Sequence, residues 1–121
     1  MAVRAGPAAI SMLAVLMIGA PAAELTFVLH IERDRVPDNM QVIRVKQGDV
    51  VKLRWSADRP TILHLHGYEI ETTVEPGAAA EMIFIARATG RFPVHLHQPN
   101  QRSSNHSHDE PPLVRIEVYP R

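Results

Sequence analysis

The sequence predicts an all-β domain, either a sandwich or a small barrel. Its 121 residues are enough for one domain and leave little room for a second. Short runs of alternating apolar and polar residues are separated by turn residues, and beyond residue 22 no long window keeps a helical period. The expected strands are residues 24–31, 40–46, 50–56, 61–70, 80–87, 91–98 and 113–119.

The first expected strands show the alternation most clearly. In residues 24–31 and 50–56 every second side chain is apolar, which is typical of a strand with one buried face. Polar or proline-containing segments at 37–39, 47–49 and 58–60 supply the turns between the strands. These signals predict regularly spaced strands in the first half of the domain.

The second half continues the same pattern. Residues 61–70 form the next run, and a Glu-Pro-Gly turn at 75–77 precedes residues 80–87. The 80–87 run is apolar on both faces, which favours a central strand, and residues 113–119 close the domain. The long polar loop at 99–112 interrupts this spacing, and long loops in compact domains are often functional.

The first 22 residues have the features of a cleaved signal peptide. Arg4 supplies a positive start, residues 10–18 are apolar, and Ala20-Pro21-Ala22 is a small-residue cleavage site. We therefore expect a signal peptide at 1–22, a domain at 23–121, export to the periplasm and no membrane segment after cleavage. Loss of Arg4 changes the formal charge from zero to about minus one, so nothing favours nucleic-acid binding.

Histidine dominates the chemistry of the chain, whereas cysteine is absent. The missing thiol excludes a thiolate zinc site, a thiol nucleophile and a blue-copper centre. Six of the seven histidines form three His-x-His pairs, which are His64/His66, His95/His97 and His106/His108. The seventh, His30, stands alone in its strand, and we interpret it as a structural or surface residue.

The first two pairs fall within expected strands. Side chains at i and i+2 share a face of a strand, so each pair points away from the leucines beside it. If the two strands are neighbours, four imidazoles meet on one patch, and imidazole suits copper, zinc or nickel. The simpler alternative is that these histidines are solvated surface, and the same holds for the pair in the 99–112 loop.

Four short motifs resemble the cupredoxin family in their order and spacing. His66-Gly67-Tyr68 is similar to the H-G-F/Y that carries the first ligand histidine in the copper domains of cytochrome oxidase subunit II and nitrous-oxide reductase. The others are the strand-turn-strand at 45–51, the Pro-Gly turn at 74–77 followed by Phe84, and Thr-Gly-Arg-Phe at 89–92. The resemblance implies a Greek-key β-sandwich.

The chain departs from this family at the ligand positions. Leu96 stands where blue-copper members carry cysteine, so the resemblance implies the fold without thiolate chemistry. The resemblance also places His66 at the first-histidine position, His106 at the second and His108 near the axial methionine. His95 and His97, on either side of Leu96, would replace the missing cysteine as ligands. The candidate metal ligands are therefore His64, His66, His95, His97, His106 and His108.

These observations predict an exported copper-binding protein without a type 1 blue-copper site. Copper, with Cu(II) favoured and zinc as the alternative, would be bound, buffered or delivered, with a periplasmic copper donor or acceptor as partner. We expect no enzyme. Two alternatives stay open, namely a cupredoxin-like interaction module without metal, and a cupin-like metalloenzyme, because His64 and His66 with Glu71 resemble the cupin metal cluster.

Overall fold

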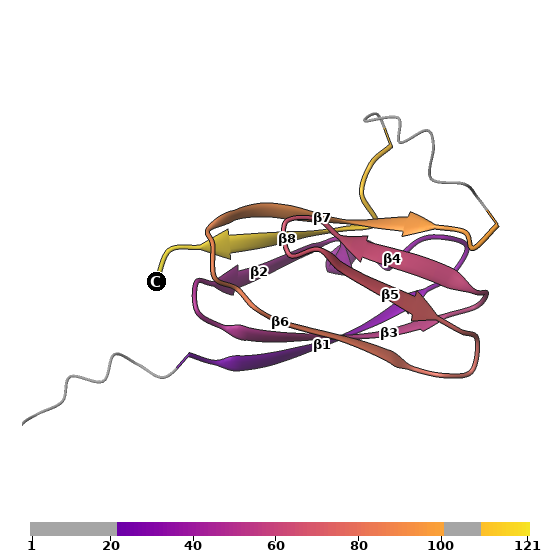
Figure 1. Cartoon of the computed structure of the whole chain (residues 1–121), viewed down its shortest axis with the longest axis horizontal. Helices are drawn as coiled ribbons and strands as arrows, with labels where there is room; N and C mark the ends of the chain where they lie inside the picture. Colours follow the sequence, from indigo (N-terminus) through magenta and orange to yellow (C-terminus); the bar gives the residue numbers. More distant parts are fainter. Residues whose placement is uncertain (1–21, 101–109) are drawn as a thin grey trace, which may run out of the picture.

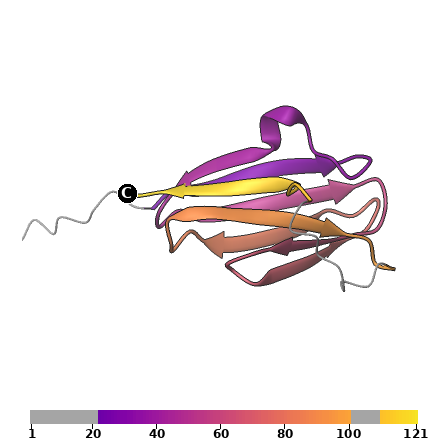
Figure 2. The same ribbon diagram turned by 90° about the horizontal axis from the view of Figure 1, so that it is seen from above.

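The computed structural model describes residues 22–100 and 110–121 of the chain. Two β-sheets lie face to face, as Figure 1 and the perpendicular view in Figure 2 show. The three-stranded sheet has the order β1-β3-β6, and its strands are β1 (Glu24–Ile31), β3 (Val50–Ala57) and β6 (Ala80–Ile85).

The five-stranded sheet is the layer that carries the candidate histidines. Its order is β2-β8-β7-β4-β5. Its strands are β2 (Val42–Lys46), β8 (Val114–Tyr119), β7 (Gly90–His97), β4 (Thr61–Leu65) and β5 (Ile70–Val74).

The chain passes repeatedly between the two sheets. β1 and β3 run parallel in one sheet and β2 and β8 run parallel in the other, whereas the remaining pairs are antiparallel. This arrangement confirms the predicted all-β sandwich. Among the described residues, no helix is long and apolar enough to cross a membrane.

The core lies between the sheets and is made of the alternating side chains of both layers. Trp55 at its centre is fully buried, and burial of such large apolar side chains is the main stabilising contribution in a domain of this kind. The other fully buried large side chains are Leu29, Ile31, Val51, Leu53, Leu63, Leu65, Met82, Val74, Val94, Val114 and Ile116.

The structure differs from the predicted strands at two places. The run expected at 61–70 ends at Leu65, turns back, and continues as a separate strand, β5. Gly67 with φ +90° and Glu69 with φ +53° make this turn, because both adopt the left-handed backbone that a strand does not contain. Met40, expected to open the second strand, instead ends a short 3-10 helix, Asp38–Met40, and β2 begins at Val42.

Candidate metal centre

The two strands that carry the first two histidine pairs are neighbours. β4 and β7 are antiparallel, and His64 lies directly opposite His95 in their register. Leu63 and Leu65 are fully buried on the inner side of β4, so the alternation puts the His64 and His95 side chains on the outer face of the sheet. The condition set in the sequence analysis, that the two strands be neighbours, is therefore met, and His64 and His95 share the outer face.

His66 joins this pair from the turn after β4. Its backbone N–H donates to the Pro93 carbonyl at 3.0 Å, which continues the ladder one residue beyond the strand. The ring of His66 lies 4.2 Å from that of His64 and 4.8 Å from that of His95, centroid to centroid. Three imidazoles are thus packed together on one surface, and we call His64, His66 and His95 the histidine trio.

Gly67 allows this turn to sit against the sheet. A Cβ at Gly67 would meet Cδ1 of Phe92 at 2.5 Å, so only glycine fits between the turn and β7. Tyr68 then packs edge-on against Phe92 and tilted against Phe84, with centroid distances of 4.9 and 4.8 Å. These aromatic contacts anchor the turn that presents His66.

Two carboxylates flank the histidine trio, and only Glu71 was considered from the sequence, within the cupin-like alternative. Glu69 places Oε2 3.5 Å from Nε2 of His64, and Glu71 on β5 is the direct cross-strand partner of His64. Alternation along a single strand at 61–70 would set Glu69 and Glu71 on the opposite side from the histidines. The turn at residues 66–69 instead reverses the chain and brings β5 alongside β4.

The remaining predicted ligands divide into two groups. His97 lies on the same outer face as His95, two residues further along β7 and opposite Ile62. His106 and His108 fall outside the described residues. His30 is exposed on the other sheet and its Nδ1 lies 2.8 Å from the Ser56 hydroxyl, as expected for a surface residue.

The donor set of the trio suits a borderline metal, because imidazole nitrogen is a common ligand of copper and zinc. Its side chains are half-buried rather than freely extended. Within residues 22–100 and 110–121, no three His, Asp or Glu side chains are already arranged as a metal site. The three histidines nevertheless fit such a metal by their chemistry and proximity. Their rings would have to reorient to bind it.

A charged cross-strand row lies on the same outer face, beyond the trio. Glu117 on β8 pairs with Arg44 on β2 at 3.2 Å and with Arg91 on β7 at 3.5 Å. The three side chains come from three adjacent strands in one row of the register. Opposite charges set directly across from one another support the sheet pairing.

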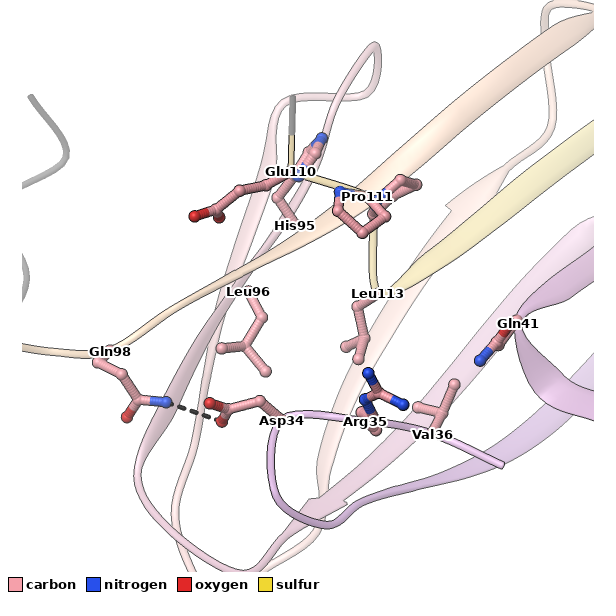
Figure 3. Close-up of a pocket in the computed structure, with 11 residues that line it drawn as sticks. Asp34, Arg35, Val36, Gln41, His95, Leu96, Gln98, Glu110, Pro111 and Leu113 are labelled. Carbon is pink, nitrogen blue, oxygen red and sulfur yellow. Dashed lines mark hydrogen bonds between the residues drawn. The ribbon is translucent and has the colours of Figure 1, made fainter. Parts of the chain in front are cut away.

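A cavity of about 490 Å³ borders His95 at the end of the sandwich (Figure 3). Its polar rim includes Asp34, whose Oδ1 accepts hydrogen bonds from Gln98 Nε2 at 2.9 Å and from Arg59 Nε at 3.1 Å. Apolar side chains, among them Leu96 and Leu113, line its interior.

Leu96 does not lie on the side of the histidines. It is the cross-strand partner of the buried Leu63, and Figure 3 shows the side chains of His95 and Leu96 pointing to opposite sides of β7. His95 and His97 therefore do not occupy the space of a side chain at position 96. A metal at the trio would bind on the outer face of the sheet, away from the place that the resemblance gives to cysteine.

No protein-family model matches the chain, and no curated protein matches it. Solved structures do match. One is a heme-copper terminal oxidase, with a TM-score of 0.59 and 15% identity over 82% of this chain and 65% of that one. A multi-copper oxidase from Pseudomonas thermotolerans has a TM-score of 0.58 and 21% identity over 83% of this chain. The chain covers only 30% of that oxidase.

A third match is similar to this chain in length. The periplasmic domain of subunit II of cytochrome oxidase from Bradyrhizobium japonicum has a TM-score of 0.57 and 17% identity, covering 84% of this chain and 86% of that domain. The chain spans less than two thirds of the two oxidases, but most of this periplasmic domain. At these identities the likeness concerns the fold. Together with the two-sheet topology, it identifies the chain as a cupredoxin-like β-sandwich.

Proposed function

We propose that this protein binds a copper ion on the outer face of its five-stranded sheet, through the imidazoles of His64, His66 and His95. The observation that carries the proposal is the contact of these three rings, at 4.2 and 4.8 Å, contributed by two strands and a turn. Three imidazoles in contact on one surface offer three nitrogen donors to a single metal ion.

Copper is favoured over zinc for this donor set. Cu(II) binds nitrogen ligands more tightly than zinc does in the Irving–Williams order, and no thiolate is present to favour Cu(I). Glu69 and Glu71 flank His64 and supply oxygen donors or negative charge beside the metal. When bound, the metal would supply a Lewis-acidic, positively charged centre, and these carboxylates would balance part of that charge.

The proposed role is binding, buffering or delivery of copper outside the cytoplasm. Ligands on the outer face of a sheet are accessible to a donor or acceptor protein, which suits metal transfer better than a deeply enclosed centre does. The solved structures of similar fold, two copper-containing oxidases and a periplasmic domain of a cytochrome oxidase, support an exported protein linked to copper. We propose no catalytic role.

The two alternatives receive less support. An interaction module would favour a continuous apolar patch, yet on the three-stranded sheet Lys52 and Arg54 of β3 separate the exposed Val28 from the exposed Ile83 and Ile85. The cupredoxin-like topology removes the fold on which the cupin-like alternative depended. The histidine trio therefore remains the principal functional feature.

The test is a Cu(II) titration of the full chain purified after export, monitored by electron paramagnetic resonance. We expect binding of one equivalent with nitrogen hyperfine structure. His64→Ala and His95→Ala should each weaken binding about a hundred-fold or more, since even outer-sphere changes commonly cost 10–100-fold.

The matched control is His30→Ala, which removes an exposed histidine from the other sheet and should leave copper binding unchanged. Equal binding by the unmodified protein and by the double variant His64→Ala/His95→Ala would overturn the proposal, because the copper would then be held elsewhere in the chain. A competition with Zn(II) in the same assay decides between the two metals.

A further inference from the structure

Asp49 is a buried carboxylate that collects hydrogen bonds from distant parts of the chain. Its exposed fraction is 3%, although it lies in a turn just ahead of β3. Oδ2 accepts the backbone N–H of Lys46 at 2.9 Å, and Oδ1 accepts the backbone N–H of Ala23 at 3.2 Å. The guanidinium of Arg121 pairs with the same Oδ1. A buried charge of this kind is stable only when it is paired and hydrogen-bonded.

The Ala23 nitrogen is held in place by the sheet. The Ala23 carbonyl accepts the Val50 N–H at 2.9 Å, just ahead of the parallel pairing of β1 with β3. Ala22 and Ala23 are both exposed, so the peptide bond between them is accessible. Figure 1 shows the start of β1 and the end of β8 at the same end of the sandwich.

We propose that the signal peptide, the leader at residues 1–22, is removed at the Ala22–Ala23 bond. The α-ammonium of Ala23 then forms an ion pair with Asp49. A leader peptidase would supply the hydrolysis. One water molecule is added, the new carboxylate leaves with residues 1–22, and the new amine stays on Ala23 and is protonated at neutral pH. This proposal is independent of copper binding, because it involves none of the histidines.

Cleavage would replace a neutral donor to the Asp49 carboxylate by a charged one without moving the nitrogen. Before cleavage Ala23 offers Asp49 an amide N–H; afterwards it offers an ammonium at the same position. The carboxylate already strengthens the bond by its own charge, and the ammonium adds the attraction of opposite charges to it. The mature chain is therefore expected to be more stable than the chain that still carries its leader.

Other charged groups face the same place and set the strength of the pair. Arg44, Lys46, Tyr119 and Arg121 line a cavity of about 500 Å³ together with Asp49. The three cations oppose a further positive charge, whereas the buried carboxylate favours it. Asp49 is the only Asp or Glu residue lining this cavity among the described residues, so the pair depends on it.

The experiment moves the α-amine one residue away from Asp49 and measures the resulting change in folding stability. Mass spectrometry of the exported chain should first show that it begins at Ala23. One glycine is then inserted between Ala22 and Ala23, so that the mature chain begins one residue earlier and Ala23 keeps only an amide N–H. In urea unfolding, we expect the insertion to lower the folding equilibrium constant about five- to ten-fold.

The same insertion in the Asp49→Asn background should change the folding constant less than about two-fold, because the charged partner is gone. Equal losses in both backgrounds, or a mature chain that begins elsewhere, would overturn the proposal. If Asp49→Asn does not fold, the acylation rate of the α-amine decides. The amine of Ala23 should react about ten-fold more slowly than that of the insertion variant, and equal rates would overturn the proposal.

Discussion

His64 and His95 stand directly opposite each other in the antiparallel pair of β4 and β7, on the solvent-facing side of the sheet. Directly opposed residues have Cβ atoms about 4.5–5.5 Å apart, so the strand register alone brings both imidazoles near a common point. A slip of one residue would turn one member toward the core. The pairing register of β4 and β7 therefore brings His64 and His95 together, and the turn after β4 adds His66.

Substitution of Leu96 by cysteine is expected not to create a blue-copper centre. The Leu96 side chain lies on the opposite side of β7 from that of His95 and is the cross-strand partner of the buried Leu63. A thiol there cannot share a metal with the histidine trio. The measurement is the visible absorption spectrum of Leu96→Cys with one equivalent of Cu(II), with unmodified protein as the control. An intense visible band in the variant alone would contradict the assignment of the trio to the outer face.

Copper affinity is expected to fall steeply as the pH drops below about 6. Imidazole binds a metal only in its neutral form, and protons compete for each of the three nitrogens. The dissociation constant should be measured by competition titration from pH 5 to 8 and should rise toward acid pH. An affinity that stays flat over this range would speak against histidine ligation.

Replacement of Gly67 by alanine should destabilise the domain more than replacement of Gly77. Both residues have positive φ, of 90° and 80°, so the backbone strain is similar. Only at Gly67 does the added Cβ collide with Phe92, at 2.5 Å, whereas nothing lies within 4 Å at Gly77. The collision should add about 1–3 kcal/mol to the loss, measured by urea unfolding. Similar losses in both variants would show that the turn adapts without contacting Phe92.

Asp49 should make the domain sensitive to acid. Burial alone would raise the pKa of its carboxyl, but the N–H groups of Lys46 and Ala23 and the Arg121 guanidinium outweigh it and lower the pKa. Since the unfolded value is about 3.9, the stabilisation is complete above that pH and is lost as the pH falls through the lower folded value.

Asp49→Asn should therefore lower the free energy of unfolding at pH 7 by about 1.5–3 kcal/mol, the scale of hydrogen bonds to a charged group. The variant should also lose part of the decline in stability that the unmodified protein shows as the pH falls below about 4. The control is Glu75→Gln, an exposed carboxylate between β5 and β6. Parallel pH profiles for Asp49→Asn and unmodified protein would contradict this role.

Local alternation was sufficient to predict the sandwich and the shared face of the histidines. The 24–31 run has the bounds of β1, and the buried Val51, Leu53 and Trp55 follow the predicted face of β3. The run at 61–70, predicted as one strand, contains a turn; its apolar residues shift from odd positions (Leu63, Leu65) to even ones (Tyr68, Ile70) across Gly67. The conformation of that turn depends on Phe92, which is distant in sequence.

The missed turn explains the misplaced carboxylates. Glu69 lies near His64 only because the chain reverses after His66, and Glu71 only because β5 then pairs with β4. If residues 61–70 are taken as one strand, alternation places Glu69 and Glu71 on the opposite face from His64 and His66. The glycine after His66 was the available signal, since glycine inside an apparent strand often marks a bend or a close backbone approach.

The separation of His64 and His95 along the chain has a kinetic consequence. The segment between them includes β5 in one sheet and β6 in the other. An ion held by both histidines would bridge β4 and β7 across that segment in the folded chain. Because the ion would bind the folded state alone, opening of β4 from β7 would first require its release. The rate at which proteases cleave the domain would then depend on how much copper is available to it.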